Sequence, residues 1–451
     1  MSLNRSLATA ATAAAVAVTL AAPASAADLL SIYELARNED AQFAQARADY
    51  RAAREQWPQA RAAVLPQLNF SASTAEVETD DNTTGTTSDF DRESFSLQLT
   101  QPLFNWEAFA GLDRADAAVA RAEAEFAAAE QDLIVRVADA YFEVLTARDG
   151  LRFARAEKRA VERQLEQARQ RFEVGLIPVT DVKEAKASFD LAVSRELEAR
   201  NQLDQAREAL RTITGRGTGA LASTRESVPL TSPEPGDAER WVERGLEQNP
   251  DYLAARQNAE AARHVMRQSR DGYYPEVNLF ARRTESEGDS TFAGGGAGAA
   301  TLDETEDEIG IELSWNLYAG GATESRNDQA RAEFQSAQAG VTNARRGVQQ
   351  RTRDAFRAVE TAIAQVKALR QAVESNRARV EATRSGFEVG TRTSVDVLNA
   401  VRDLYRAERD LADARYNYIV SRLRLKRASG TLTVEDVRRI NGWLQADGSG
   451  S

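Results

Sequence analysis

The chain has 451 residues and a formal net charge of −12, with 57 Lys and Arg against 69 Asp and Glu. This length suits one large repeated unit or roughly two to three ordinary domains, and the acidic balance argues against a general nucleic-acid-binding protein. The chain has no cysteine, which excludes a disulfide, a thiolate nucleophile and a sulfur-ligated metal site.

The first 26 residues have the pattern of a secretory signal peptide. Arg5 provides a positive charge, the apolar run LATAATAAAVAVTLAA follows it, and Ala24 and Ala26 form an A-x-A cleavage pattern. We therefore expect residues 1–26 to be removed, with an uncleaved anchor as the alternative. No later segment approaches the roughly 20 apolar residues of a membrane-spanning helix, so any membrane insertion must use another architecture.

The remaining chain reads as two copies of one unit. FEVGLIPVTDV at 172–182 recurs as FEVGTRTSVDV at 387–397, an offset of 215 residues. VLPQLNF and YYPEVNL pair in the same way near the start of each copy. Between the copies, TSPEPGD is rich in proline and small residues, a composition typical of a linker. The expected divisions after the signal peptide are a first repeat at 27–215, a linker at 216–236, a second repeat at 237–430 and a C-terminal segment at 431–451.

Each copy begins with a predicted helical stretch, at 28–63 and at 237–272, and continues into two strand candidates separated by a polar loop. In DEIGIELSW, Ile311 and Leu313 fall on one face of the strand and Glu312 on the other. This alternation suits a membrane barrel with lipid outside and water inside, although a soluble sheet with one wet face gives the same pattern. The predicted strands are 68–73, 93–101, 277–282 and 307–315, with loops at 77–91 and 288–305.

The number of strands limits how such a barrel could close. One chain offers four strand candidates, whereas a membrane barrel usually needs at least about eight. An open sheet edge is not tolerated in lipid. If these strands lie in a membrane, two or more chains must therefore share one barrel.

A very long helical region closes each copy and breaks once, at the repeated FEVG motif. Val397, Leu404 and Leu411 follow a seven-residue spacing, and alanines stand three positions after each, as at Ala400 and Ala407. Large residues at one seam position and alanines at the other allow two helix backbones to approach closely. The sequence therefore predicts long antiparallel coiled-coil packing.

The interruption itself has a local explanation. Gly175 and Gly390 can adopt the left-handed conformation that ends a helix, and Pro178 or Ser394 can help to start the next one. An aspartate stands six residues after each glycine, where a carboxylate suits the positive end of the new helix. A helical hairpin with a tight turn is therefore one complete interpretation of the motif, and a functional contact at the turn is the other.

The remaining candidate sites are weak. His264 is the only histidine, and without a second histidine or a cysteine we expect no metal site and no histidine-based triad. We place His264 on a helix surface. GGGAG at 294–298 lacks the lysine of a phosphate-binding loop and is interpreted as a flexible loop. The sequence thus predicts neither an enzyme nor a cofactor.

In their order and duplication, the repeats and junction motifs resemble the TolC family of outer-membrane efflux and secretion channels over nearly the whole mature chain. The junction motifs are QPLFNW at 101–106, WNLYAGG at 315–321, ARYNY at 414–418 and ASGTL at 428–432. The resemblance implies a homotrimer with a shared twelve-stranded barrel and a long periplasmic helical tunnel. It also implies that small equatorial elements, here 216–236 and 431–451, surround the tunnel midway.

The resemblance further implies outer-membrane lipid, a periplasmic adaptor (membrane fusion) protein and an inner-membrane transporter as partners. The implied function is export of small toxic molecules or secreted polypeptides through the tunnel. An exported coiled-coil adaptor that bridges two membranes without a pore is the alternative. Paired amphipathic strands at equivalent places in both copies favour the channel.

The resemblance also places a gate at the periplasmic tips of the helices. In the family, a threonine–aspartate pair from the first copy meets a tyrosine and an arginine from the second. Here Thr180 and Asp181 match the first pair and Arg392 matches the arginine. Phe387 occupies the tyrosine position and has no hydroxyl, so that tether is absent and the Arg–carboxylate bond becomes the expected latch.

The family's inner constriction is matched only in part. Asp396 corresponds to one of its two aspartate rings, whereas Asn399 occupies the other. A threefold assembly would hold carboxylates in one ring and amides in the next. We expect such a constriction to bind cations more weakly than two rings of carboxylates.

Overall fold

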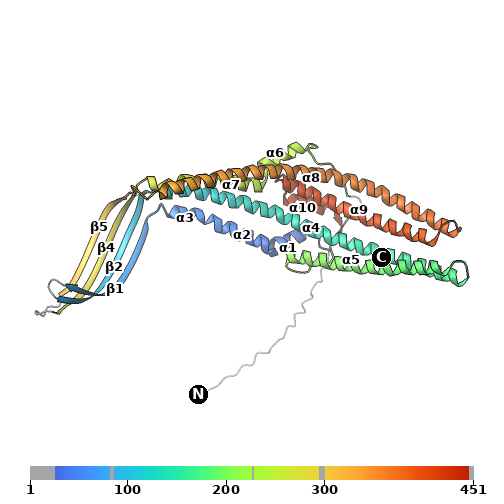
Figure 1. Ribbon diagram of the computed structural model, residues 1–451, viewed down its shortest axis with the longest axis horizontal. Helices are drawn as coiled ribbons and strands as arrows, with labels where there is room; N and C mark the ends of the chain where they lie inside the picture. The colour runs from blue at the N-terminus through green and yellow to red at the C-terminus, as the bar shows by residue number, and fades with distance from the viewer. Residues whose placement is uncertain (1–25, 82–85, 226–227, 294–299, 446–451) are drawn as a thin grey trace, which may run out of the picture.

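A computed structural model of the protein describes residues 26–81, 86–225, 228–293 and 300–445. The GGGAG loop and all but the last residue of the predicted signal peptide lie outside these ranges. The described part is long and narrow, with a curved sheet at one end and two long helical hairpins at the other (Figure 1).

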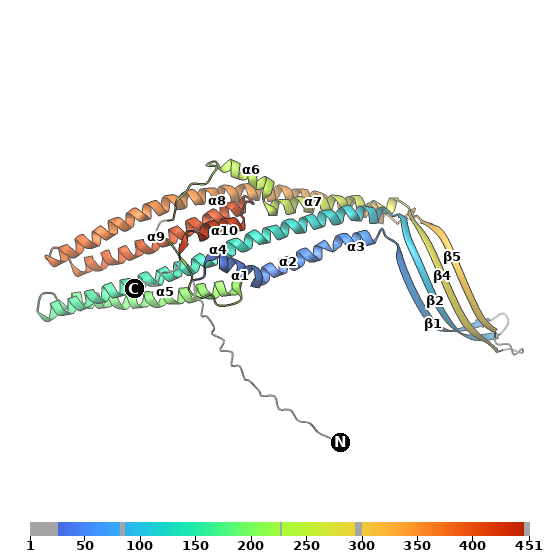
Figure 2. The same cartoon turned by 180° about the vertical axis from the view of Figure 1, so that it is seen from behind.

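Short helices run beside the long ones, between the sheet and the middle of the molecule (Figure 2). They correspond to the two predicted helical stretches, but each stretch is interrupted. Asp40 and Asn249 end one helix and cap the next, because their side chains accept hydrogen bonds from backbone N–H groups in the following first turn. These helices are α1 (Leu29–Glu39), α2 (Ala41–Arg54), α3 (Gln56–Ala62), α6 (Ala238–Gln248) and α7 (Pro250–Gln268).

Two antiparallel hairpins of very long helices form most of the molecule. The alanines of the predicted seam are buried, among them Ala185 and Ala192 in the first hairpin and Ala400 and Ala407 in the second. The predicted coiled-coil packing is therefore confirmed. Within the described ranges, none of the helices combines the length and the apolar character needed to cross a membrane. The first hairpin consists of α4 (Trp106–Glu173) and α5 (Val179–Thr214), and the second of α8 (Ala322–Glu388) and α9 (Ser394–Ala428).

The four predicted strands form one antiparallel sheet in the order β1-β2-β4-β5. The strands are longer than predicted, because residues assigned to the loops 77–91 and 288–305 continue the pairing as far as Asp81↔Thr86 and Ser290↔Ala300. The loop assignment rested on polar side chains, whereas a ladder is held by backbone hydrogen bonds that polar residues also form. The strands are β1 (Gln67–Asp81), β2 (Thr86–Phe104), β4 (Glu276–Ala293) and β5 (Ala300–Ser314).

The two faces of the sheet differ in polarity near the helices, as predicted. The register places Leu68 opposite Leu99 and Leu279 opposite Ile311, so these apolar side chains share one face. Ile311 and Leu313 are 66% and 63% exposed in the single chain. Glu312 alternates with them and therefore lies on the other face. An apolar face with this much exposed surface indicates a contact with lipid or with another protein chain.

The segments that follow the first and the second copy meet in the middle of the molecule. There β3 (Ser223–Thr224) pairs with β6 (Leu444–Gln445), and the short helix α10 (Val434–Asn441) contributes Val437 and Ile440 to the main core. Gly430 packs directly against the backbone of Gln248, so that a Cβ added to this glycine would lie 2.3 Å from the Gln248 carbonyl oxygen. Its φ of +72° is in the left-handed region that favours glycine.

The surface position predicted for His264 is wrong. Only 9% of the residue is exposed, and its ring lies between α7 and α4. Its Nδ1 is 3.6 Å from Asp113 Oδ2, and its Nε2 is 3.3 Å from Glu260 Oε1. The small side chains of this part of α7, such as Ala259, let the two helices pack closely and bury the ring.

Candidate functional site at the tips of the helical hairpins

Both long hairpins turn at a glycine in the same way. Gly175 and Gly390 have φ angles of 77° and 80°, in the left-handed region that glycine adopts without strain. The turns are closed by equivalent hydrogen bonds, from the Leu176 N–H to the Arg171 carbonyl and from the Thr391 N–H to the Gly386 carbonyl, each 2.8 Å long. The predicted glycine conformation is confirmed, and both copies present the same tight tip.

The two helices that leave the tips begin differently. Helix α5 starts after Pro178, without a side-chain cap. Helix α9 starts with a capping box, in which the Asp396 N–H donates to Thr393 Oγ1 and Asp396 Oδ2 accepts from the Thr393 N–H at 3.0 Å. Helix α9 begins at Ser394, as expected, but the side chain of Thr393 caps it and Ser394 is buried.

The capping box also sets the charge of Asp396. Hydrogen bonds from the Thr393 backbone and hydroxyl hold the pKa of Asp396 below its usual value, and the nearby charges of Arg392 and Arg379 act in the same direction. Asp396 is therefore a carboxylate at neutral pH. Asn399 follows three residues later on the same side of α9 and is partly buried.

The residues matched to the family's latch lie on separate hairpins. Thr180 and Asp181 are on the first turn of α5, where the Thr180 hydroxyl lies 3.5 Å from Asp181 Oδ1. Arg392 is exposed in the turn before α9, and its side chain folds back over Gly386. Of the ion pairs within 4.0 Å among the described residues, none joins Asp181 to Arg392. A single chain does not bring this pair together.

Other contacts join the two hairpins near the tips, and the sequence did not indicate them. The Arg171 guanidinium carbon lies 4.2 Å from the centre of the Phe387 ring, which links α4 to α8. Gln164 Nε2 donates a 3.0 Å hydrogen bond to Ser394 Oγ, which links α4 to α9 in a buried position. The motif makes Phe172 and Phe387 equivalent, yet Phe172 is 43% exposed and Phe387 only 8%.

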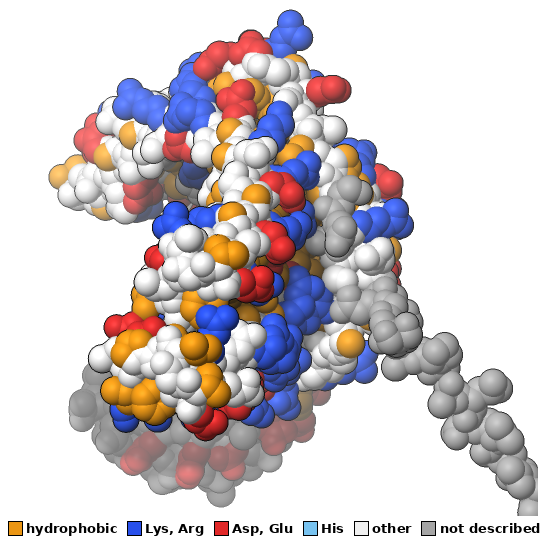
Figure 3. All heavy atoms as spheres, turned by 90° about the vertical axis from the view of Figure 1, so that its right-hand side faces the viewer, with side chains coloured by type: hydrophobic (Ala, Val, Ile, Leu, Met, Phe, Trp, Pro, Cys, Tyr) orange, Lys and Arg blue, Asp and Glu red, His pale blue; other side chains and the backbone are white. Residues whose placement is uncertain are grey.

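The tips end in exposed apolar side chains. Val174 and Leu176 of the first tip are 69% and 72% exposed, and Val389 of the second is 75% exposed. Seen from this end, hydrophobic side chains lie on the nearest tip, with charged side chains around them (Figure 3). Exposed apolar side chains on both tips indicate that the tips contact another protein chain.

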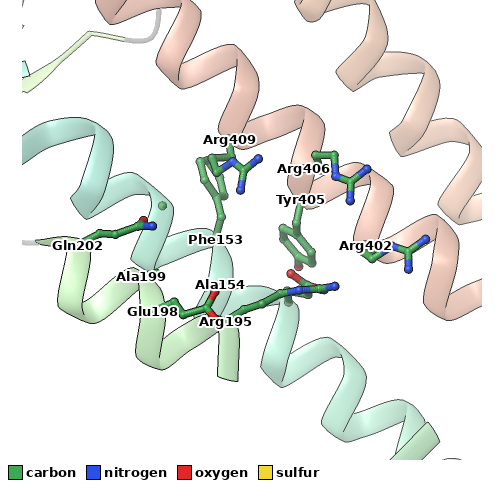
Figure 4. A pocket seen from close by; sticks show the side chains of 12 residues that line it. Phe153, Ala154, Arg195, Glu198, Ala199, Gln202, Arg402, Tyr405, Arg406 and Arg409 are labelled. Carbon is green, nitrogen blue, oxygen red and sulfur yellow. The ribbon is translucent and has the colours of Figure 1, made fainter. Parts of the chain in front are cut away.

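A small cavity of about 160 Å³ lies further from the tips, between α4, α5 and α9 (Figure 4). Its central charges already pair, since Arg195 Nη1 is 2.6 Å from Glu157 Oε1. Figure 4 shows Tyr405 pointing toward Arg195, whereas Arg402 and Arg406 point away from them. Within the described residues, no three His, Asp or Glu side chains are placed to hold a metal ion.

Comparison with known proteins places this architecture in a family. The chain is 37% identical over 427 residues to the outer membrane protein TolC of Vibrio cholerae, covering 95% of this chain and 96% of the relative. It is 30% identical to the alkaline protease secretion protein AprF of Pseudomonas aeruginosa, covering 91% and 86%. The fold matches the solved CmeC outer membrane channel of Campylobacter jejuni with a TM-score of 0.75 and 16% identity, covering 98% of each chain.

The family described as "Outer membrane efflux protein" matches residues 32–216 and 241–431, which include both long hairpins and all four strands of the sheet. This chain belongs to the outer membrane efflux protein family.

Proposed function

We propose that this protein is a trimeric channel-tunnel of the outer membrane, through which small toxic molecules or secreted polypeptides leave the cell. The observation that carries the proposal is the sheet. It has an exposed apolar face around Leu68 and Ile311, and its two edge strands, β1 and β5, have one neighbour each. Apolar face and open edges are both satisfied when copies of the sheet join side by side in lipid.

Three copies supply twelve strands, which is sufficient for a membrane barrel. The long hairpins of the same three chains then form a tunnel that continues the barrel into the periplasm. The measurement is the mass of the protein purified in detergent, which should correspond to three chains and should survive mild heating. A stable monomer in the absence of detergent would rule the proposal out and would favour a pore-less coiled-coil adaptor.

The organisation of the chain supports the same assembly. We assign the repeats to 27–215 and 237–430, so that each provides two strands and one long hairpin. We assign the segments 216–236 and 431–451 to an equatorial belt, and the pairing of β3 with β6 within their described residues supports this assignment. In a trimer, the two hairpins of each chain would then alternate around the tunnel as six similar units.

The partners follow from the position of the tips. A periplasmic adaptor and an inner-membrane transporter would meet the tunnel at its far end, where Val174, Leu176 and Val389 are exposed. The relative AprF is a secretion protein for alkaline protease, which supports polypeptides as one class of cargo beside small molecules. Crosslinking in intact cells followed by purification should recover an adaptor. Recovery should fall when Leu176 is replaced by Asp.

A gate at the tips completes the proposal. Asp181 and Arg392 would pair between hairpins of neighbouring chains, with Thr180 helping to fix the arginine. Both charged groups are free for this role, since neither takes part in an ion pair among the described residues. Asp396 and Asn399 would form the constriction just inside. Replacing Arg392 by Ser tests the latch and should raise the conductance of the channel.

A further inference from the structure

Between Asp149 and the tips, the two hairpins share few polar contacts. Among the described residues, the Gln164–Ser394 hydrogen bond is the one polar side-chain link between the hairpins on the tip side of Asp149. Beside it lies a cavity of about 420 Å³, bordered by Gln164, Arg171 and Phe387. Apolar packing, such as that of Leu398 against Val161 and Leu165, therefore provides most of the contact between the hairpins here, and specific polar contacts are few.

Arg171 is suited to be one of those bridges. It lies in the last turn of α4, where a positive charge is favoured by the helix dipole. Within the described part of the chain no carboxylate forms an ion pair with it. Its guanidinium stands 4.2 Å from the Phe387 ring centre, within the range of a cation–π contact. The aromatic ring thus provides the principal partner of this charge.

Phe387 is held in position from its other side. The ring is 8% exposed and packs in a cluster with Val380, Val397 and Val401, which fixes it between α8 and α9. About two turns of α4 before Arg171, Gln164 is 8% exposed and its partner Ser394 is 2% exposed, so their hydrogen bond is shielded from water. A buried hydrogen bond of this kind is costly to break on one side only.

We infer that Arg171 and Phe387 form a cation–π clasp that, together with the Gln164–Ser394 hydrogen bond, holds the two hairpins of each chain together in the closed tunnel. The inference rests on the proposed function as a gated duct. The clasp lies within one chain, whereas the Asp181–Arg392 latch joins neighbouring chains. Phe387 has no hydroxyl with which to form a hydrogen bond, and in the clasp the contact of its ring face with Arg171 takes the place of that hydrogen bond.

The clasp makes a specific prediction for a double-mutant cycle in planar bilayers. Phe387→Leu keeps an apolar side chain and removes the aromatic face, and Arg171→Met keeps the aliphatic stem and removes the charge. A cation–π contact contributes about two- to thirty-fold to an equilibrium. Each substitution removes this contact from all three protomers, so it should raise the ratio of open to closed channels by at least a factor in this range. The double substitution should add little to the larger single effect.

Matched controls separate the clasp from general loosening. Arg169→Met removes an exposed arginine of the same helix that pairs only with Glu166 at 3.7 Å, and it should leave gating unchanged. Phe387→Tyr keeps the aromatic face and should retain wild-type closure or strengthen it. Independent effects of Phe387→Leu and Arg171→Met, adding in full in the double variant, would overturn the clasp.

Salt distinguishes the clasp from the latch between chains. Raising KCl from 0.1 M to 1 M shortens the screening length from about 10 Å to about 3 Å, which weakens an exposed ion pair more than a cation–π contact on a buried ring. The effect of Arg392→Ser relative to wild type should shrink in 1 M KCl, and that of Phe387→Leu should persist. If Arg392→Ser opens the channel but the clasp variants do not, the clasp is wrong and the gated duct stands. If no tip substitution changes gating, the gate itself is wrong.

Discussion

Gly430 tests the close contact in the middle of the molecule. An alanine there would combine the strain of a positive φ with a Cβ 2.3 Å from the Gln248 backbone oxygen, which cannot move without shifting α6 and α7. We expect Gly430→Ala to lower the free energy of unfolding by about 3 kcal/mol or more. Gly175→Ala is the control, since its φ is equally positive but its Cβ meets open space, and it should cost about 1 kcal/mol. Denaturant unfolding in detergent measures both, and equal losses would contradict the packing described here.

The partly buried carboxyl group of Asp413 on α9 should make the free energy of unfolding depend on pH. Burial raises the pKa of this carboxyl to about 6, and the nearby carboxylates of Asp410, Glu143 and Asp149 add to the effect against the opposing charge of Arg409. Because the pKa is higher in the folded state, the protonated form stabilises the fold at low pH, and this contribution is lost as the pH rises through 6.

Asp413→Asn removes that titration. The variant should be more stable than wild type by about 1 kcal/mol at pH 7.5, a figure reduced because the group remains partly accessible to solvent. Its advantage should shrink as the pH falls through 6 and should be small at pH 4. Asp190→Asn is the control, because Asp190 is an exposed residue of α5 that pairs with Lys186 at 2.9 Å and does not act on Asp413, so it should gain nothing. A constant advantage for Asp413→Asn across this pH range would show that burial does not govern the group.

The conformation of some single residues could be predicted from the sequence, whereas the burial of others could not. The left-handed glycines at 175 and 390 were predictable because a turn between two helices requires that backbone locally. The burial of Phe387, Ser394 and His264 was not, because it depends on which helix packs against them. Sequence spacing identifies a seam between neighbouring helices, and it does not identify contacts between α4 and α9, which lie more than 200 residues apart.

The sheet is the element whose orientation can be tested most simply. Leu313 belongs to the exposed apolar face of β5 and Glu312 to the opposite face. Arg in place of Leu313 should impair assembly in the membrane, at a cost of up to about 2–4 kcal/mol if the residue lies near the middle of the bilayer. Arg in place of Glu312 should allow assembly and should shift ion selectivity toward anions. Heat-resistant trimers on gels and reversal potentials in bilayers report the two outcomes, and identical behaviour of the two variants would show that the faces are misassigned.

At the scale of elements, the sequence predicted kinds and order better than lengths. The repeated heptads identified both long hairpins, because buried alanines at one seam position leave a regular trace. The strands extend into the segments predicted as loops, because alternation of apolar residues marks only the part of a strand that faces an apolar environment. Residues 77–81 and 300–305 are mostly polar yet paired, and this criterion therefore could not identify them as parts of strands.

At the scale of the whole molecule, duplication explains why the same tip occurs twice. Each copy supplies two strands and one hairpin, so a threefold ring of chains alternates the two kinds of hairpin around its axis. A closed end then needs contacts between unlike copies. The single chain provides those within a protomer, at Arg171–Phe387 and Gln164–Ser394. In the proposed gate, Asp181 and Arg392 make the contacts between protomers.

The central claim is a duct closed at its tips, and single-channel conductance in planar bilayers tests it most directly. Exposed ion pairs are individually worth about 0–1 kcal/mol, but three latches in a ring act together on one opening. We expect low conductance for wild type and a clear rise for Arg392→Ser, to which Asp181→Ala adds little. Arg331→Ser should leave conductance unchanged, because Arg331 pairs with Asp328 on α8 at 3.0 Å, far from the tips. No measurable channel for any variant would contradict the duct, and a channel whose conductance Arg392→Ser does not change would contradict the latch.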